Sequence, residues 1–403
     1  MPAETLPSPA HGLPPHEASE ALPSPASLPV QSSPVQFDLG FSRSQELEHV
    51  RERVEADDRG KWDATVLRQD LSWQGDRLVL PDAYAGEFPQ SLSPSPWAAS
   101  QLCSQLGIPA GYFRRCPRHL QEAQFAHWCH YAMAHDDDGL PRHDLLARRE
   151  HWLLRGKNAA LRGVLSARYA KLDNGQLLDC LLPLIDERFQ VSWHAVTDES
   201  FHLRLVDPAL SQDILPGDRL LAGIHVGNSE VGKRSVSIDA VVFRLVCSNG
   251  LIRVVNGKGL LRQRHVSWDP PRFQERLSKA ISRALVEGAA FLSRLVATTR
   301  VPVPDIEDAL LALGERWNLS LGTRQTVKVN LLAMPAAHQE SLWGLVNAVT
   351  QAAQGLAPDE RYDLEALAGT LAEQGLPKTT SAKSRLPRLL VPEAGPREPT
   401  TVQ

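Results

Sequence analysis

Cysteine is scarce in this chain of 403 residues, and no long apolar run occurs in it. The five cysteines are too few for a disulfide framework, and their odd number leaves one thiol unpaired. A reducing compartment such as the cytoplasm is therefore the simpler interpretation. No run of about 18 apolar residues is present, so no membrane-spanning helix is predicted. Residues 1–20 have neither a basic start nor an apolar segment, and so they predict no secretory signal.

An excess of charge of either sign is also missing. Lysine and arginine total 43, aspartate and glutamate total 47, and the net charge is -4. Hydrophobic residues make up 42% of the chain and charged residues 22%. These values exclude a wholly disordered, collagen-like or coiled-coil chain, and they exclude a uniformly basic protein of histone type. The apolar content is sufficient for a sizeable core.

The familiar motifs of nucleotide, hydrolase and metal sites are absent from the sequence. No G-x-x-x-x-G-K-[ST], G-x-S-x-G or H-E-x-x-H pattern occurs. The spacing of Cys103, Cys116 and Cys129 does not match the paired ligands of a structural zinc site. The acidic run 136–138 lacks the spaced oxygens of a calcium loop, and we interpret it as a solvated loop. We therefore predict no catalytic residue, no metal and no cofactor.

One catalytic alternative stays open at Cys247. This cysteine could be a nucleophile with His225 or His265 as its base. A free cysteine at the end of a strand is more often a small core residue. An unchanged function in the Cys247→Ala variant would remove the catalytic alternative.

The composition divides the chain into two tails and a folded part. Residues 1–36 are rich in proline, serine and alanine, and such a segment buries too little apolar surface to fold, so a disordered tail is predicted. Residues 375–403 are interpreted as a second, mildly basic disordered tail. Between them we predict an α+β subdomain at 37–140, a central antiparallel sheet with a long helix at 141–300, and a helical part at 301–374.

Short segments rich in β-branched and aromatic residues predict strands in the middle of the chain. They cover 151–155, 159–165, 189–196, 201–206, 219–227, 235–246 and 250–255, and a hairpin is predicted within 63–80. Helices are predicted at 42–54, 95–107, 118–133, 175–187, from 270 onward, 304–316, 337–354 and 361–374. The predicted fold class is α+β, with a central, mostly antiparallel sheet and helices packed on one side of it.

Charges are unevenly distributed along the chain, although their total is nearly balanced. A basic block at 233–283 contains only three acidic residues, and an acidic helical block follows at 301–375. Clustered lysine and arginine are typical of a polyanion-binding surface, because phosphates that are neutralised release condensed counterions. Alternatively, the two blocks neutralise each other within the protein or between subunits. Both interpretations are open at this point.

The polyanion interpretation singles out the cations in or beside the predicted strands. The candidate nucleic-acid-binding residues are Arg168, Lys233, Arg234, Arg253, Lys258, Arg262, Arg264 and His265. Arginine suits this role because its guanidinium group contacts phosphate with two parallel hydrogen bonds. Nearby aromatic residues could stack on bases, although burial in the core is their commoner role. These aromatic residues are Tyr169, Trp193, Phe243 and Trp268.

Three stretches of the chain resemble a family of phage and plasmid proteins. Residues 163–174 are similar to an L-S-x-R-Y-x-x-L-D-N element, and residues 228–232 and 243–251 are similar to N-S-E-x-G and R-x-V-C-x-N-G. Residues 345–350 are close to an N-A-x-T helix. Over about residues 95–370 the chain resembles the phage/plasmid-like proteins grouped as domain of unknown function family 932. The motif residues are Tyr169, Asp173, Asn174, Asn228, Ser229, Glu230, Gly232, Arg244, Cys247, Asn249, Gly250 and Asn347.

The resemblance implies a place on mobile DNA or in a prophage, and it implies no established activity. It favours a DNA transaction over metabolism. Asn228 and Asn249 are expected before tight turns, which their side chains can close as Asx turns. Gly232 and Gly250 are expected to supply positive φ. Arg244 alternates with apolar residues in a predicted strand, so we expect a structural or sheet-surface role for it.

Three functions are consistent with these observations. The first is a non-enzymatic protein that binds or anneals single-stranded DNA, with DNA favoured over RNA and no membrane partner. A curved sheet followed by a long helix is also the layout of RecT- and Erf-like annealing proteins, by fold-level analogy. Many of those assemble as rings, so a homo-oligomer is consistent as well. The second function is a protein-interaction module of a mobile element, and the third is the enzyme centred on Cys247.

Overall fold

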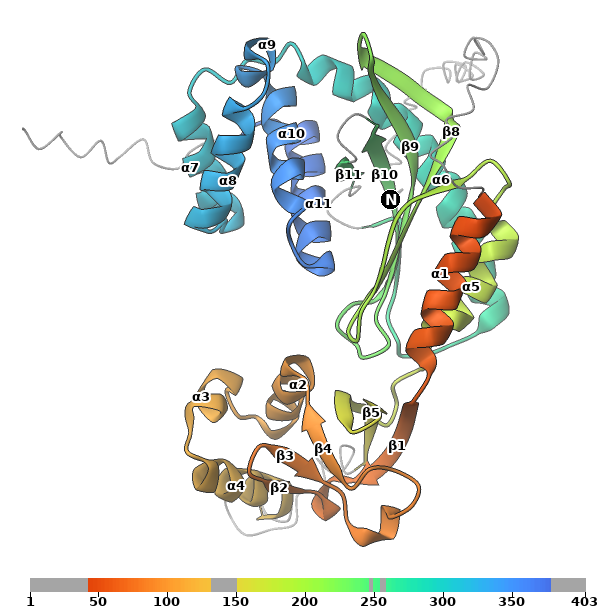
Figure 1. Cartoon of the computed structure of the whole chain (residues 1–403), viewed down its shortest axis with the longest axis vertical. Coiled ribbons are helices and arrows are strands. Elements are labelled where there is room, and N and C mark those ends of the chain that lie inside the picture. Colours follow the sequence, from red (N-terminus) through yellow and green to blue (C-terminus); the bar gives the residue numbers. More distant parts are fainter. Residues whose placement is uncertain (1–42, 132–150, 246–248, 254–258, 378–403) are drawn as a thin grey trace, which may run out of the picture. The chain divides into compact units, whose positions relative to one another are not determined.

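A computed structural model describes residues 43–131, 151–245, 249–253 and 259–377. The tail predicted at 1–36 lies outside these residues, as does all of the second predicted tail except 375–377. Strands and helices occur in separate groups, which confirms the α+β class (Figure 1). Among the described helices, none is long and apolar enough to cross a membrane.

The first sheet contains six strands. In spatial order they are β1 (Lys61–Leu67), β5 (His151–Lys157), β6 (Ala160–Ser166), β4 (Ser91–Pro94), β3 (Arg77–Val79) and β2 (Ser72–Gln74). Only the β4–β6 pair is parallel. The predicted hairpin within 63–80 is confirmed, because β2 and β3 pair on either side of Gly75, whose φ is 67°.

Helices α2 (Pro96–Leu106), α3 (Ala110–Arg115) and α4 (Arg118–Ala126) complete this part of the fold. Helix α2 is predicted well, because the Ser95 hydroxyl accepts a hydrogen bond from Ala98 N and Pro96 occupies the first turn. Gly107 ends the helix with a φ of 70°. Apolar residues of α2 and α4 pack with those of β1, β5 and β6 in one core.

The strands at 151–157 and 160–166 differ from the prediction. They were expected in the central sheet, but β5 pairs along its whole length with β1, from Lys61 opposite Lys157 to Leu67 opposite His151. The predicted boundary near residue 140 therefore falls between strands of one sheet. The apolar pattern of a strand identifies the strand but carries no information about a partner that lies about ninety residues away.

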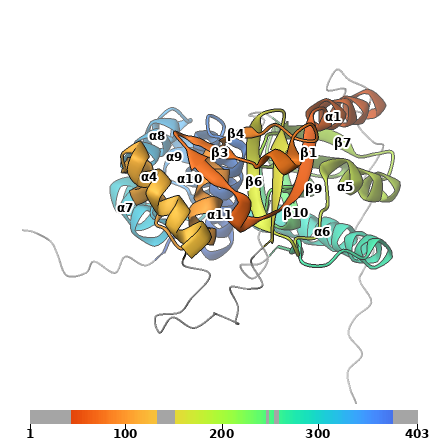
Figure 2. The same ribbon diagram turned by 90° about the horizontal axis from the view of Figure 1, so that it is seen from below.

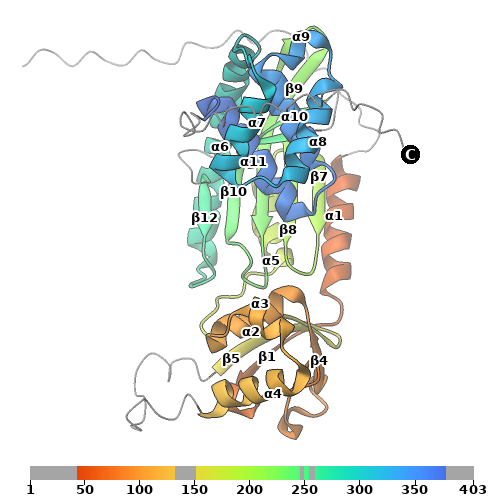
Figure 3. The same ribbon diagram turned by 90° about the vertical axis from the view of Figure 1, so that its left-hand side faces the viewer.

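The second sheet is an antiparallel meander. Strands β7 (Gln190–Val196), β8 (Phe201–Leu215), β9 (Asp218–Asn228), β10 (Val236–Arg244) and β11 (Asn249–Arg253) follow one another in space, and β12 (Leu261–Gln263) also pairs with β10 (Figure 3). Side chains alternate between the two faces. One face carries apolar residues such as Leu203, Ile224 and Ile238, and the other carries His202, His225 and Asp239, all of them buried.

The apolar face is covered by α1 (Arg43–Asp58), α5 (Asn174–Leu181) and α6 (Pro270–Thr298) (Figure 2). Asp269 caps α6, and apolar residues spaced three or four apart, such as Phe273 and Leu277, pack on the strands. Gly288 lets the helix approach closely, because a Cβ there would lie 3.2 Å from the Ala222 Cβ.

Five further helices form the C-terminal part. They are α7 (Ile306–Trp317), α8 (Leu321–Leu332), α9 (Ala336–Gln339), α10 (Leu342–Ala353) and α11 (Pro358–Gln374). Helix α8 was not predicted, because glycine, threonine, valine and asparagine are weak helix formers. Single-turn elements complete the described chain at Arg68–Asp70, Asp82–Tyr84, His127–Tyr131 and Leu182–Leu184.

Helices cover both faces of the second sheet, whereas the prediction placed them on one side of it. Helix α11 lies against β11 and directs Tyr362 and Glu365 onto the polar face, where they contact Asp239 and Arg204. In a sheet covered on one side only, the polar residues of β8, β9 and β10 would face water. They are buried because α11 covers this face and supplies carboxylates to His202 and Arg204 and a hydroxyl to Asp239.

Candidate nucleic-acid interface

The turn between β9 and β10 places the carboxylate of Glu230 inside the protein, with 1% of its side chain exposed. Lys61 Nζ lies 2.8 Å away, Arg162 Nη2 lies 2.9 Å away, and Asn174 N donates a hydrogen bond of 3.0 Å. Burial by itself would raise the pKa of Glu230. The charges of Lys61 and Arg162 outweigh it and lower the pKa to about 2. Glu230 is therefore ionised at neutral pH.

Arg155 connects the two motif stretches through a second set of contacts. Its guanidinium lies 2.7 Å from carboxylate oxygens of both Asp63 and Asp173, and it donates to the Glu230 carbonyl oxygen at 2.8 Å. Asn228 Nδ2 donates to Asn174 Oδ1 at 2.9 Å, across 54 positions of sequence. These contacts bring the motif residues of 163–174 and 228–232 into one hydrogen-bonded network, which we call the Glu230 network.

Sequence analysis did not single out Arg155, Arg162 or Lys61. The only signal was a charged residue within each of the apolar strands β5 and β6. The two arginines are buried, with 3% of each residue exposed. A buried arginine requires a paired carboxylate, and none of the carboxylates is near it in the sequence.

Asn228 and Gly232 play different parts in the turn. Gly232 has a φ of 72°, which confirms the expectation of a positive φ. Asn228 was expected to close a local turn, but its side chain donates to Leu172 O at 3.1 Å and to Asn174. Ser229 Oγ accepts a hydrogen bond from Lys233 N at 2.9 Å and so holds the turn together.

Tyr169 and His265 stack on each other, with ring centroids 4.9 Å apart and planes 12° apart. The Tyr169 hydroxyl donates to Ser229 O at 3.0 Å, and Ala170 N donates to His265 O at 2.9 Å. His265 is only 8% exposed, and burial lowers its pKa to about 4. This predicted binding residue is therefore neutral at pH 7 and lies beneath the surface.

Arg168 and Arg264 flank this stack and are exposed. The backbone bond between Ala170 and His265 holds their two segments together. Within the described residues, neither arginine has an acidic partner. Arg276 contacts Gln263, next to Arg264. Arg272 lies one turn earlier on α6, with 84% of its side chain exposed and its Nε 3.4 Å from Asp269 Oδ2. We call Arg168, Arg264, Arg272 and Arg276 the exposed arginine patch.

The other described cations of the candidate set are paired within the protein. Lys233 contacts Glu199 and lies 3.0 Å from Asp359, while Arg234 lies 3.4 Å from Asp359. Arg262 lies 2.9 Å from the Asp239 carboxylate and donates to the Tyr362 hydroxyl at 2.8 Å. For Lys233 and Arg234 the contacts favour compensation between the basic block and the acidic helices, the alternative that sequence alone left open. Arg262 is neutralised by Asp239, an acid of the basic block itself.

Helix α11 also supplies carboxylates to the buried polar face of the second sheet. His202 Nδ1 lies 3.2 Å from His225 Nε2, and His202 Nε2 lies 3.1 Å from Asp359 Oδ1. Arg204 is fully buried and pairs with Glu365. Burial lowers the pKa of both histidines. His225 is therefore a neutral core residue in this arrangement.

Arg244, Gly250 and Asn347 form a smaller motif cluster. Arg244 Nε lies 2.6 Å from Asp218 Oδ1, and Arg244 Nη1 donates to Asn347 Oδ1 at 3.3 Å, which favours the expected structural role. Gly250 was expected to supply a positive φ, but it is a strand residue opposite Phe243. It is required for space, because a Cβ there would overlap the guanidinium of Arg204.

Several candidate residues are not among those that the structure describes. Lys258, Cys247 and the acidic run 136–138 lie outside the described residues. The backbones of Asn249 and Arg253 belong to β11, but their side chains also lie outside the described set. The aromatic candidates that are described have partners within the protein. Trp193 lies between Arg204 and Arg361, Phe243 is buried, and Trp268 packs on Phe273.

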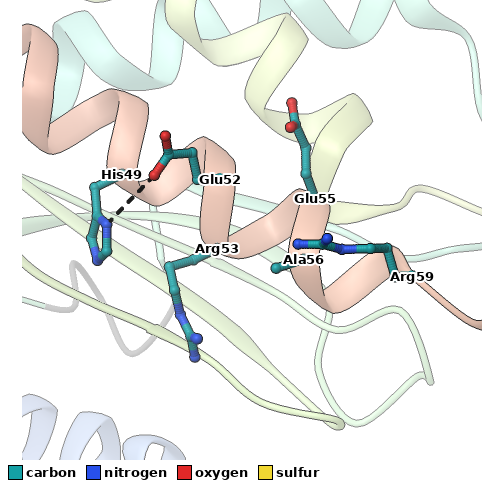
Figure 4. Close-up of a pocket in the computed structure, with 6 residues that line it drawn as sticks. All are labelled: His49, Glu52, Arg53, Glu55, Ala56 and Arg59. Carbon is teal, nitrogen blue, oxygen red and sulfur yellow. Dashed lines mark ion pairs between the residues drawn. The ribbon is translucent and has the colours of Figure 1, made fainter.

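Two further places in the described chain have the outline of a site. Asp57, Asp58 and Glu230 lie close enough together to hold a cation, but Lys61 Nζ already lies 2.7, 2.7 and 2.8 Å from them. A hollow beside α1 is lined by residues of that helix alone (Figure 4). Two of them, His49 and Glu52, form a pair with 3.9 Å between Nδ1 and Oε2. Residues of one helix do not enclose a ligand, and Lys61 already neutralises the acidic cluster. We therefore assign a ligand to neither place.

Comparisons with known proteins add no relative: no family model, no curated protein and no solved structure matches the chain.

Proposed function

We propose that this chain is a phage- or plasmid-type cytoplasmic protein that binds single-stranded DNA without catalysing a reaction, and that the exposed arginine patch contacts the phosphates. One observation carries the proposal. The segments that carry Arg168 and Arg264 are held together by the Tyr169–His265 stack and by the Ala170–His265 backbone bond, and in the described chain no carboxylate neutralises either arginine. Exposed guanidinium groups without acidic partners are free to replace the counterions of a phosphate backbone.

The fixed position of the patch supports this role. Tyr169 is anchored to Ser229 by its hydroxyl, and the Glu230 network holds the turn that contains Ser229. The motif residues 163–174 and 228–232 therefore hold the segment that carries Arg168 in place. A binding surface on a rigid support loses less entropy when it binds. This arrangement accounts for the charged network without assigning it a reaction.

The test is fluorescence anisotropy with a labelled single-stranded oligonucleotide and the matching duplex, each measured across a salt series. The variant is Arg168→Ala/Arg264→Ala. The matched control is Arg300→Ala/Arg316→Ala, which removes two exposed arginines elsewhere that have no acidic partner among the described residues. Each phosphate contact contributes roughly 0.7 to the slope of log K against log salt for single strands. The patch variant should lose about 1.4 of that slope, because two such contacts disappear.

Tighter binding of the single strand than of the duplex is expected of a protein that anneals DNA. Binding that is equally weakened in the control variant would mean that only net charge matters, and it would overturn the assignment of the patch. Failure to bind either form of DNA at low salt would overturn the function itself.

A protein-interaction module is the second candidate. The observation that favours it is an apolar stripe on α8, where Leu321 is 63% exposed, Val329 65% and Leu332 51%. Exposed apolar residues that gather on one helix commonly mark a partner surface. If DNA binding fails, a comparison of partners captured by the wild type and by a Leu321→Ser/Val329→Ser variant tests this candidate.

A further inference from the structure

An open groove of about 770 Å³ lies between α11 and the connection from α7 to α8. Trp317 lines it from the end of α7, Leu319 from the connection and Leu367 from α11. The groove contains none of the residues of the exposed arginine patch. An apolar trough of this size and shape fits an extended peptide segment better than a small polar ligand.

Two carboxylates give the groove a negative rim. Glu360 is exposed, and the side chain of Asp363 is 74% exposed. Among the described residues Asp363 forms an ion pair with Arg234, whose Nη2 lies 3.9 Å from Asp363 Oδ1, close to the outer limit of an ion pair. The occupant that matches this surface therefore combines apolar side chains with positive charge.

The chain itself supplies such a segment directly after α11. Residues 378–391 contain four cations and no acidic residue, and they end in the apolar sequence Leu386-Pro387-Arg388-Leu389-Leu390-Val391. No other stretch of the printed sequence outside the described residues combines four cations with this apolar run and no acid.

The chain that follows α11 is long enough to return to the groove. Helix α11 ends at Gln374, Gly375 has a φ of 73°, and Leu376 packs against the neighbouring core. The groove runs beside α11 from Glu360 to Thr370, which at 1.5 Å per residue is about 15 Å. Residues 375–384 can span up to about 33 Å, so the link is long enough for the segment to reach any part of the groove.

We propose that residues 385–391 bind in this groove of their own chain, antiparallel to α11, with their leucines on the apolar floor and their arginines beside Glu360 and Asp363. The proposal does not depend on DNA binding. It assigns the groove to an intramolecular peptide. It also makes the segment available to a second copy of the chain when it leaves its own groove.

The experiment measures binding of a fluorescent peptide of residues 378–391 to four forms of the full-length chain: three forms that test the proposal and one matched control. In the tail variant, Leu386, Leu389 and Leu390 are changed to Asp, which should empty the groove. The second form is the wild type. The third is the tail variant with Glu360→Lys and Asp363→Lys, and its matched control carries Glu87→Lys and Glu187→Lys, two exposed acids away from the groove.

The peptide should bind the tail variant at least ten-fold more tightly than it binds the wild type, because the wild-type groove is already occupied. The charge reversal at Glu360 and Asp363 should weaken binding at least ten-fold, and the control reversal should not. A circular dichroism spectrum like that of the wild type shows that each form is folded.

Two results would overturn the proposal. If the tail variant binds the peptide no better than a scrambled peptide of the same composition, the groove does not recognise this segment. If the wild type and the tail variant bind the peptide equally well, the segment does not occupy the groove of its own chain.

Discussion

The Glu230 network and the exposed arginine patch are adjacent but use their charges in opposite ways. In the network, Glu230, Arg155 and Arg162 are buried and paired with partners of opposite charge. In the patch, Arg168 and Arg264 are exposed and have no acidic partner among the described residues. A buried charge without a partner is strongly destabilising, whereas an exposed charge is stabilised by water. The first group therefore stabilises the fold, and the second is available to a ligand.

The largest expected effect is on the network. Glu230→Gln would leave the buried Arg162 without its carboxylate partner, while Lys61 would keep Asp57 and Asp58. Breaking a buried ion pair costs about 3–5 kcal/mol. We expect the free energy of unfolding in urea to fall by about that amount. The control is Glu187→Gln at an exposed acid, which should change it by less than about 0.5 kcal/mol. A loss below about 1 kcal/mol for Glu230→Gln would show that the network is not a source of stability.

The change in stability with pH that Glu230 causes should be somewhat smaller than the loss caused by Glu230→Gln. Burial opposes ionisation of Glu230, but Lys61 and Arg162 lower its pKa from 4.5 to about 2. A carboxyl group with a lowered pKa stabilises the fold above its unfolded pKa, and this stabilisation is lost as pH falls from about 4.5 to about 2. The difference between the two pKa values corresponds to roughly 3 kcal/mol.

The stability difference between the wild type and the Glu230→Gln variant, measured at pH 7 and at pH 3, isolates this contribution from that of the other acids. The difference should shrink at the lower pH. A difference that does not change with pH would contradict the lowered pKa of Glu230.

The smallest effect on stability is expected at the patch. Arg168→Ala/Arg264→Ala removes no described ion pair, so the free energy of unfolding should change by less than about 0.5 kcal/mol per site. Chemical denaturation measures this directly. A loss of 2 kcal/mol or more would place these arginines among the structural charges and would remove the contrast between the two regions.

Local structure was predicted correctly where interactions between residues close in the sequence determine it. Ser95, Pro96 and Gly107 set the bounds of α2, because capping and backbone preference act within a few residues. The strands of the second sheet were also predicted to within a few residues, apart from the longer β8 and the short β12, which was not predicted. Helix α8 was missed because its residues favour a helix only weakly and its stability comes from packing on α10.

Contacts between distant parts of the chain could not be predicted in the same way. The sequence determined by itself the α+β class, the alternation of strand residues, the caps of α2 and α6, and the separation of a basic block from an acidic one. Tertiary structure decided which sheet β5 joins, that α11 neutralises Arg234 and Arg204, and that Arg168 remains exposed. The physical reason is range: caps and side-chain alternation act over a few residues. An ion pair such as Arg204–Glu365, by contrast, joins positions 161 residues apart and forms only when the whole fold has brought them together.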